Sequence, residues 1–191
     1  MKLKFEFTLK FTETKLKGCF ILEPKIIKDE RGYFMESFNE KTFQEGVGQK
    51  VTFVQDNQSF STKGVLRGLH YQCGAHAQAK LVRVLDGEVL DVAVDLRPES
   101  ETFGQYEAVL LSAENQTQFF VPRGFAHGFL VFSETATFFY KCDNFYNKES
   151  EGGILFNDET LNIDWNFPVQ DLIISDKDKV LPNLQNAKKV W

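Results

Sequence analysis

The chain alternates short apolar runs with polar residues in a pattern that predicts many β-strands. Along Glu88–Asp95, odd-numbered residues fall on one face and even-numbered residues on the other, which is the two-residue period of a strand. Other segments are rich in β-branched and aromatic residues, which favour strands. The predicted strands are Val51–Gln55, Lys80–Leu85, Glu88–Asp95, Gln118–Val121, Gly128–Phe132 and Ala136–Tyr140.

Turn signals between these runs complete the prediction of a β-rich fold. Asp86-Gly87 separates two predicted strands and is a dipeptide favoured in tight hairpin turns. Helix signals are scarce: Asn39–Val47 predicts about two turns, and a second short helix begins at Ser175, with Asp178 in a capping-box-like position. We therefore predict an all-β fold, either a double-sheet jelly roll or a closed barrel, with a few short helices.

Length and composition are those of one globular domain spanning residues 1–191. Apolar residues make up 42% of the chain and charged residues 26%, which rules out wholesale disorder. No apolar run reaches the roughly 20 residues of a membrane helix, and Met1–Phe7 lacks the apolar core of a signal peptide. The net charge of -5 argues against nucleic-acid binding, so we expect neither nucleic acid nor membrane as a partner.

The cysteines indicate a reducing compartment. Cys19, Cys73 and Cys142 are three in number, widely spaced and without a CxxC pair, so neither a zinc knuckle nor a redox motif is visible. Reduced thiols in a cytoplasmic protein are the simplest interpretation.

Two histidines lie in turn-plus-strand segments and are the first candidates for chemistry. His70 belongs to Arg67–Gln72, the most polar part of the predicted strands, and His127 follows Pro122. In a regular strand Arg67 and His70 would point to opposite faces, unless a bulge or turn at Gly68 re-aims them. A single histidine here is more often a structural hydrogen-bonding residue than a catalyst, so the residues alone leave both interpretations open.

The segment that ends at His127 reads Pro-x-Gly-x-x-His and resembles the second motif of the cupin superfamily, whose fold is a small β-barrel jelly roll. Metal-binding cupins also carry a His-x-His motif followed by Glu. Here the matching stretch is His70-x-Gln72, and Lys80 stands near the place of the acid. An ammonium group has no lone pair for a metal and repels one. The resemblance therefore implies a cupin pocket without metal or other cofactor.

From about Gly18 to Asp178 the chain resembles one family in particular, the dTDP-4-dehydrorhamnose 3,5-epimerases. The first residues, within 1–17, are an N-terminal extension or strand region beyond the usual start of that family. The matching segments, in chain order, are Asp29–Glu36, Phe53–Asn57, Val65–Gln72, Lys80–Arg83, Asp91–Arg97, Thr102–Gly104, Gly124–Phe129, Tyr140-Lys141 and Ser175–Asp178.

This resemblance implies an isomerase of dTDP-L-rhamnose biosynthesis that converts dTDP-4-dehydro-6-deoxy-D-glucose into dTDP-4-dehydro-L-rhamnose. The C4 ketone acidifies the protons at C3 and C5, because each carbanion delocalises into it as an enolate. Inverting a carbon then needs a base on one face, an acid on the other, and a cation at the enolate oxygen.

The same resemblance gives four residues catalytic roles. His70 matches the base, Asp178 the carboxylate that orients it, Tyr140 the acid on the opposite face, and Lys80 the cation near the C4 oxygen. Considered without the resemblance, each has a structural alternative. Asp178 could cap a helix, Tyr140 could be a buried residue of a strand, and Lys80 could be a solvated residue at the start of a strand.

Further residues match contacts to the nucleotide sugar, and some of them imply a second subunit. The resemblance implies a homodimer with exchanged N-terminal strands, in which the early Arg and the Gln-Asp-Asn segment reach the site across the interface. The implied substrate-binding residues are Arg31, Glu36, Gln55, Asp56, Asn57, Arg67, Lys80, His127, Glu151 and Lys177.

Two other functions stay open at this stage. A single-centre epimerase or a ketoisomerase acting on a related dTDP-4-keto-deoxysugar would share the histidine base, although Tyr140 together with His70 favours chemistry on two faces. A non-catalytic sugar-binding cupin is the alternative from another class, and it would not need this set of base, acid and cation.

Overall fold

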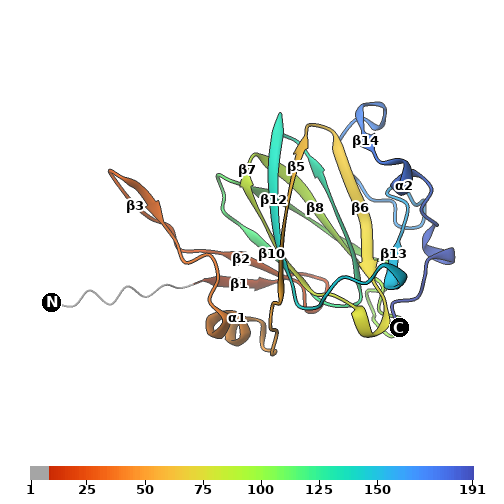
Figure 1. Cartoon of the computed structure of the whole chain (residues 1–191), viewed down its shortest axis with the longest axis horizontal. Coiled ribbons are helices and arrows are strands. Elements are labelled where there is room, and N and C mark those ends of the chain that lie inside the picture. Colours follow the sequence, from red (N-terminus) through yellow and green to blue (C-terminus); the bar gives the residue numbers. More distant parts are fainter. Residues whose placement is uncertain (1–8) are drawn as a thin grey trace.

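The computed structural model describes residues 9–191, and within them two antiparallel sheets pack face to face (Figure 1). Met1–Phe7, expected not to be a signal peptide, lies outside the described residues. The first sheet has the order β1-β2-β10-β7-β12-β5 and the second β13-β6-β11-β8-β9, with β14 parallel to β6. This arrangement confirms the prediction of an all-β double-sheet jelly roll.

The strands of the first sheet are β1 (Lys10–Glu13), β2 (Phe20–Glu23), β5 (Gln55–Thr62), β7 (Lys80–Asp86), β10 (Gln118–Val121) and β12 (Thr135–Cys142). Those of the second sheet are β6 (Val65–Gln72), β8 (Glu88–Asp95), β9 (Tyr106–Ser112), β11 (Phe125–Val131), β13 (Glu151–Gly153) and β14 (Ile173–Ile174). A separate hairpin joins β3 (Ile27–Asp29) to β4 (Gly32–Phe34) and projects from the body of the molecule (Figure 1).

The helices are short, as the sequence predicts. α1 (Glu40–Val47) begins after Asn39, whose side chain accepts a hydrogen bond from the Thr42 backbone N–H. α2 (Asp176–Lys179) begins after Ser175, whose hydroxyl accepts a bond from the Asp178 backbone N–H at 3.1 Å. Single 3₁₀ turns cover Gly74–His76, Lys148–Ser150, Val169–Asp171 and Leu184–Asn186.

Three hydrophobic clusters hold these layers together. One lies between the sheets and includes Phe119 and Phe138, both almost fully buried. A second lies where the C-terminal segment covers the outer face of the second sheet and includes Trp165. The third places Phe43 of α1 against the outer face of the first sheet. Much of the phenylalanine therefore fills the core.

Two of the local predictions are wrong. Val51–Gln55 is not a strand, because Val51 packs beneath α1 with Phe53 and sheet pairing begins only at Gln55. Asp86-Gly87 does not close a hairpin, because β7 belongs to the first sheet and β8 to the second. Gly87 has φ +81, and a Cβ atom there would collide with the Thr135 carbonyl oxygen. The dipeptide is a tight crossing between the sheets.

Candidate active site

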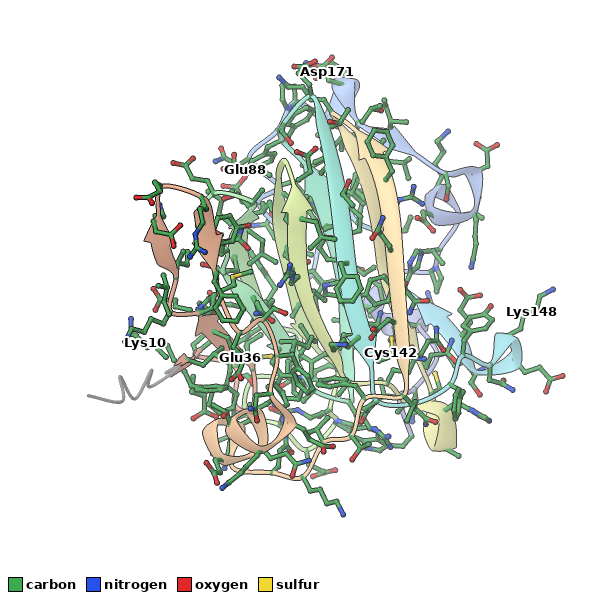
Figure 2. The ribbon with its side chains drawn as sticks, turned by 60° about the vertical axis from the view of Figure 1, so that its left-hand side comes forward. Lys10, Glu36, Glu88, Cys142, Lys148 and Asp171 are labelled. Atoms are coloured by element: carbon green, nitrogen blue, oxygen red, sulfur yellow. The ribbon has the colours of Figure 1, made fainter. Side chains whose placement is uncertain are left out.

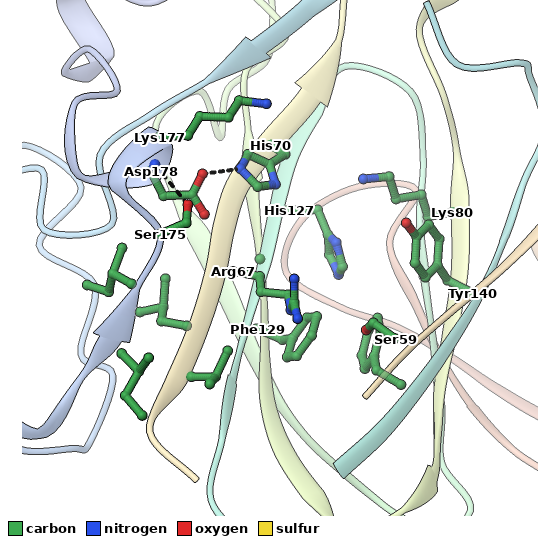
Figure 3. Close-up of a pocket in the computed structure, with 16 residues that line it drawn as sticks. Ser59, Arg67, His70, Lys80, His127, Phe129, Tyr140, Ser175, Lys177 and Asp178 are labelled. Carbon is green, nitrogen blue, oxygen red and sulfur yellow. Dashed lines mark hydrogen bonds and ion pairs between the residues drawn. The ribbon is translucent and has the colours of Figure 1, made fainter. Parts of the chain in front are cut away.

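A cavity of about 530 Å³ lies between the two sheets, and a second of about 390 Å³ adjoins it. Strands β5, β7 and β12 line the larger cavity from the first sheet, β6 and β11 from the second, and residues 173–178 close its edge. Both cavities share His70, Lys80 and Tyr140. In Figure 3, His70 and Asp178 stand across the cavity from Lys80 and Tyr140. The four residues matched to catalysis therefore meet at one place.

His70 on β6 is held by Asp178 on α2. The Nε2 atom of His70 lies 2.7 Å from Asp178 Oδ1, and the Gly68 backbone N–H donates to Asp178 Oδ2 at 3.4 Å. Asp178 is only 3% exposed. Burial alone would raise the pKa of Asp178, but the hydrogen bond and charge of His70, with the Gly68 bond, hold it below its ordinary value. Ser175 Oγ accepts a hydrogen bond from the Asp178 backbone N–H at 3.1 Å, and the Asp178 side chain is bonded to His70.

Arg67 and His70 line the same cavity although regular alternation would separate them. The register between β6 and β11 shifts between His127 and Phe129, opposite this part of β6. Gly68 has φ +131, and a Cβ atom there would lie 2.6 Å from the Gly128 Cα atom. The irregularity considered at Gly68 is therefore present, and it brings both side chains to one face.

Lys80 and Tyr140 come from neighbouring strands of the first sheet. Lys80 pairs with Cys142, and Tyr140 with Val82, so all four share the inner face of the sheet. Lys80 Nζ lies 5.8 Å from the centre of the Tyr140 ring. Among the described residues no carboxylate forms an ion pair with Lys80. Its positive charge is therefore available to a ligand in the cavity.

Burial moves the pKa values of this pair in opposite directions. It lowers the pKa of Lys80, against the opposing fields of Cys142 and Asp91. It raises the pKa of Tyr140, with Cys142 adding to the shift and Arg67 opposing it. Tyr140 is thus held as a neutral phenol, which is the form that donates a proton.

A second histidine–carboxylate pair lies deeper in the cavity wall. His127 on β11 places Nε2 2.9 Å from Asp91 Oδ1 and 3.0 Å from Oδ2 of the same residue on β8. His127 is 7% exposed and Asp91 is fully buried. The sequence predicts a site role for His127 but none for Asp91. The available signal was an acid in the middle of a strand that is otherwise apolar at its centre.

Arg67, Lys177 and Glu151 stand at or near the cavity mouth. Arg67 Nε donates to Ser61 Oγ at 3.1 Å, and Lys177 Nζ pairs with Glu151 Oε1 at 2.6 Å. The Glu151 bond raises the pKa of Lys177. Lys177 is therefore held as a cation that is already paired with a carboxylate.

Gln55 and Asn57 line the second cavity from β5 of the same chain, with Gln55 Nε2 donating to Asn57 Oδ1 at 3.0 Å. These two residues of the segment expected to act across a dimer interface therefore line a cavity of their own chain. Asp56, between them, points to the other face of the strand and pairs with Lys141 at 2.9 Å. The structure does not bring Asp56 into either cavity.

Arg31 and Glu36 also lie away from the cavities of their own chain. The Arg31 side chain is 84% exposed in the β3–β4 connection and pairs with Asp29. Figure 2 shows Glu36 on the side of the molecule that carries α1, whereas Lys148, in the loop before β13, lies on the opposite side.

Metal ligands are not gathered anywhere in the part of the chain that the structure describes: no three His, Cys, Asp or Glu side chains come together in a suitable cluster. Three residues stand where metal-binding cupins carry the His-x-His motif and the acid. Of these, His70 and Lys80 line the larger cavity, and Gln72 lies in the wall of the second cavity. No helix within residues 9–191 combines the length and apolar character needed to span a bilayer.

Sequence comparison relates the chain to sugar-nucleotide epimerases. A family model described as dTDP-4-dehydrorhamnose 3,5-epimerase matches residues 13–186. The dTDP-4-dehydrorhamnose 3,5-epimerase of Shigella flexneri is 59% identical over 166 residues, which cover 87% of this chain and 91% of that protein.

Comparison of structures agrees with this relationship. The crystal structure of dTDP-4-dehydrorhamnose 3,5-epimerase from Elizabethkingia anophelis is 60% identical, with a TM-score of 0.91 over 96% of this chain and 99% of that one. A 3,5-epimerase from Legionella pneumophila, solved in complex with dTDP-4-keto-L-rhamnose, is 50% identical, with a TM-score of 0.90 and 94% of each chain covered.

Proposed function

The chain belongs to the dTDP-4-dehydrorhamnose 3,5-epimerase family, and we propose that His70, Lys80, Tyr140 and Asp178 carry its chemistry. The protein is an isomerase. It epimerises C3 and C5 of dTDP-4-dehydro-6-deoxy-D-glucose and yields dTDP-4-dehydro-L-rhamnose for dTDP-L-rhamnose biosynthesis. The observation that carries the assignment of roles is the His70–Asp178 pair facing Lys80 and Tyr140 across one cavity.

His70 removes the proton from C3 and from C5 in turn. As the ring takes up a proton it becomes an imidazolium, and the Asp178 carboxylate at 2.7 Å stabilises that charge. The buried position of Asp178 keeps water from competing for the same hydrogen bond. The carboxylate also fixes which ring nitrogen faces the sugar, because Nε2 is bonded to it.

Lys80 stabilises the enolate that each abstraction creates. The electron pair left on carbon moves into the C4 ketone, and negative charge grows on the C4 oxygen. An ammonium group in a buried cavity, without a carboxylate partner among the described residues, interacts strongly with that charge. The same burial lowers the pKa of Lys80.

Tyr140 returns a proton from the face opposite to His70. The enolate carbon takes the phenolic proton, and the configuration at that carbon inverts because the proton left on the His70 side. The transient phenolate lies near Lys80 Nζ, which favours its formation during the step. Solvent then restores the proton on Tyr140 and takes up the proton from the His70 imidazolium, so that both residues are reset before the second carbon reacts.

Arg67 and Lys177 bind the diphosphate, and His127 contacts the sugar. Arginine offers paired donors to phosphate oxygens, and both cations lie on the wall of the larger cavity. The second cavity is lined by Gln55, Asn57 and Glu151. It adjoins the first cavity at His70, Lys80 and Tyr140, and it has room for the nucleoside.

The β3–β4 hairpin supports the proposal of a homodimer with exchanged N-terminal strands. It projects from its own domain and exposes Arg31, Tyr33 and Phe34, a cation and two aromatic rings that suit a nucleotide in a neighbouring subunit (Figure 1). Arg31 and Glu36 then act on the partner's substrate. Mixing inactive His70→Ala with inactive Arg31→Ala protein should regain activity, because a mixed dimer holds one complete site; persistent inactivity would contradict the exchange.

We place the enzyme in the cytoplasm. Cys19, Cys73 and Cys142 are all buried and unpaired with one another, which agrees with a reducing compartment.

The function is tested by incubating the protein with dTDP-4-dehydro-6-deoxy-D-glucose in deuterated water and following the sugar by NMR. Deuterium at both C3 and C5, with formation of the rhamno product, is the expected result. Deuterium at one carbon alone would show a single-centre epimerase instead, and no exchange would contradict an enzymatic role.

A further inference from the structure

One buried hydroxyl in the larger cavity lacks a hydrogen-bond partner. The Oγ atom of Ser59 on β5 is inaccessible to solvent and has no partner within residues 9–191. Its neighbours on the same face of the strand are both engaged. Asn57 accepts a bond from Gln55 at 3.0 Å, and Ser61 accepts one from Arg67 at 3.1 Å. Ser59 is thus the unsatisfied position of a polar row.

The surroundings of Ser59 make that hydroxyl sensitive to a ligand. Ser59 pairs with Phe138 on β12, and the Phe138 ring stacks on Phe129 with centroids 4.1 Å apart. These rings offer no hydrogen-bonding group that would compensate for the loss of water around the hydroxyl. In Figure 3, Ser59 lies at the lower end of the view, below Tyr140 and away from Lys80, and Arg67 lies across from it at the same end.

We propose that Ser59 hydrogen-bonds the C2 hydroxyl of the hexose and makes the enzyme select sugars that retain it. The inference rests on the proposed function, which puts the C4 oxygen at Lys80. The substrate then has two free hydroxyls, at C2 and C3. The C3 hydroxyl changes direction when C3 inverts, whereas the C2 hydroxyl keeps its configuration from substrate to product. A serine fixed in a strand can therefore hold the C2 hydroxyl throughout the reaction.

The position of Ser59 agrees with this pairing. In the sugar ring C2 lies two bonds from C4, toward the anomeric carbon that carries the diphosphate. Ser59 likewise lies away from Lys80 and beside the row that positions Arg67, the proposed phosphate-binding residue. A serine hydroxyl both donates and accepts, so it can pair with a sugar hydroxyl in either sense.

The test compares the natural substrate with its 2-deoxy analogue in the wild type and in Ser59→Ala. We expect the wild type to favour the 2-hydroxy sugar by about three- to tenfold in kcat/KM, the effect of one neutral hydrogen bond. Ser59→Ala should lose that factor on the natural substrate and act on the 2-deoxy sugar as the wild type does. Gln58→Ala, on the outer face of the same strand, is the matched control and should keep the preference.

Two results would overturn the inference. The first is equal use of both sugars by the wild type, which needs no variant to fold. The second is an equal loss on both sugars in Ser59→Ala, which would show a structural role. If the wild type turned over neither sugar, the proposed function would fail together with this inference.

Discussion

Replacement of Asp178 by asparagine removes the charge that supports the proposed base. The asparagine amide has nearly the same size, and its oxygen can still accept the bond from the Gly68 backbone N–H. The backbone N–H at this position keeps its bond to Ser175 Oγ, so α2 retains its cap. The substitution therefore removes the negative charge 2.7 Å from His70 Nε2, and it turns the amide NH2, a donor, toward that nitrogen in place of an acceptor.

The size of the effect follows from that contact. A hydrogen bond to a charged group contributes about 1.5–3 kcal/mol, and each 1.36 kcal/mol corresponds to a factor of ten in rate. Asp178 is 3% exposed, so water cannot replace the lost charge. We expect kcat to fall by about 10- to 150-fold with little change in KM, because the imidazolium exists during the reaction and not in the substrate complex.

The same substitution predicts a change in the pH dependence of stability. Burial raises the pKa of Asp178, but the hydrogen bond and charge of His70 outweigh it, and the pKa in the folded protein is below its ordinary value. The carboxylate therefore stabilises the fold above the unfolded-state pKa of about 4, and this contribution is lost as pH falls through the folded-state pKa. The difference in free energy of unfolding between wild type and Asp178→Asn should shrink on acidification.

The assay is the rate of deuterium incorporation at C3 and C5, with chemical denaturation at several pH values for stability. Ser175→Ala is the control. It removes the α2 cap, costs about 1 kcal/mol of stability and leaves the carboxylate in place. If Asp178→Asn exchanged deuterium within twofold of the wild-type rate while folding normally, the assignment of Asp178 as the supporting charge would be refuted.

Three further substitutions test other parts of the structure. Tyr140→Phe keeps the ring beside Lys80 but removes the proton donor, so NMR should show continued exchange at C3 while product formation falls by about 10²- to 10⁴-fold; normal product formation would remove Tyr140 from the mechanism. Lys80→Met should lower kcat by about 10²–10³-fold. Because the folded-state pKa of Lys80 is lowered, the wild-type free energy of unfolding should rise with pH between the folded and unfolded pKa values, and Lys80→Met should lack that rise in denaturation curves. Gly87→Ala places a Cβ against the Thr135 carbonyl at φ +81 and should cost more than about 1 kcal/mol; an unchanged Tm would contradict the tight crossing.

Local patterns predict most strands of this fold, because an alternating strand is visible within its own residues. β8 and β10 lie where the alternation and the β-branched residues place them. Local patterns fail to predict the structure of a segment where packing against distant parts of the chain decides it. Val51 and Phe53 have strand-like composition, but α1 draws both into a cluster on the outer face of the first sheet. Asp86-Gly87 has the residues of a hairpin, but the choice between hairpin and crossing depends on where β12 lies.

In the candidate site too, sequence motifs identify some features, and the pairing of distant strands determines others. The four residues that the resemblance on short motifs assigns to catalysis, His70, Lys80, Tyr140 and Asp178, line one cavity. Arg67 and His70 share one face because the register between β6 and β11 shifts. No sequence pattern in either strand specifies this shift.

The sequence does not predict the role of Asp91, because its partner, His127, is 36 residues away and meets it only through the pairing of β8 with β11. An acid in the middle of a buried strand is nonetheless a signal that can be found in sequence. Such an acid requires a partner, because an unpaired buried charge is costly.

In the proposed mechanism one base, His70, acts at both carbons from one side of the cavity. This role is tested most directly by the His70→Ala variant, incubated with dTDP-4-dehydro-6-deoxy-D-glucose in deuterated water and followed by NMR at C3 and C5 separately. Loss of deuterium incorporation at both carbons, in a protein that unfolds like the wild type, is the predicted result. Continued incorporation at either carbon would show that another residue removes that proton.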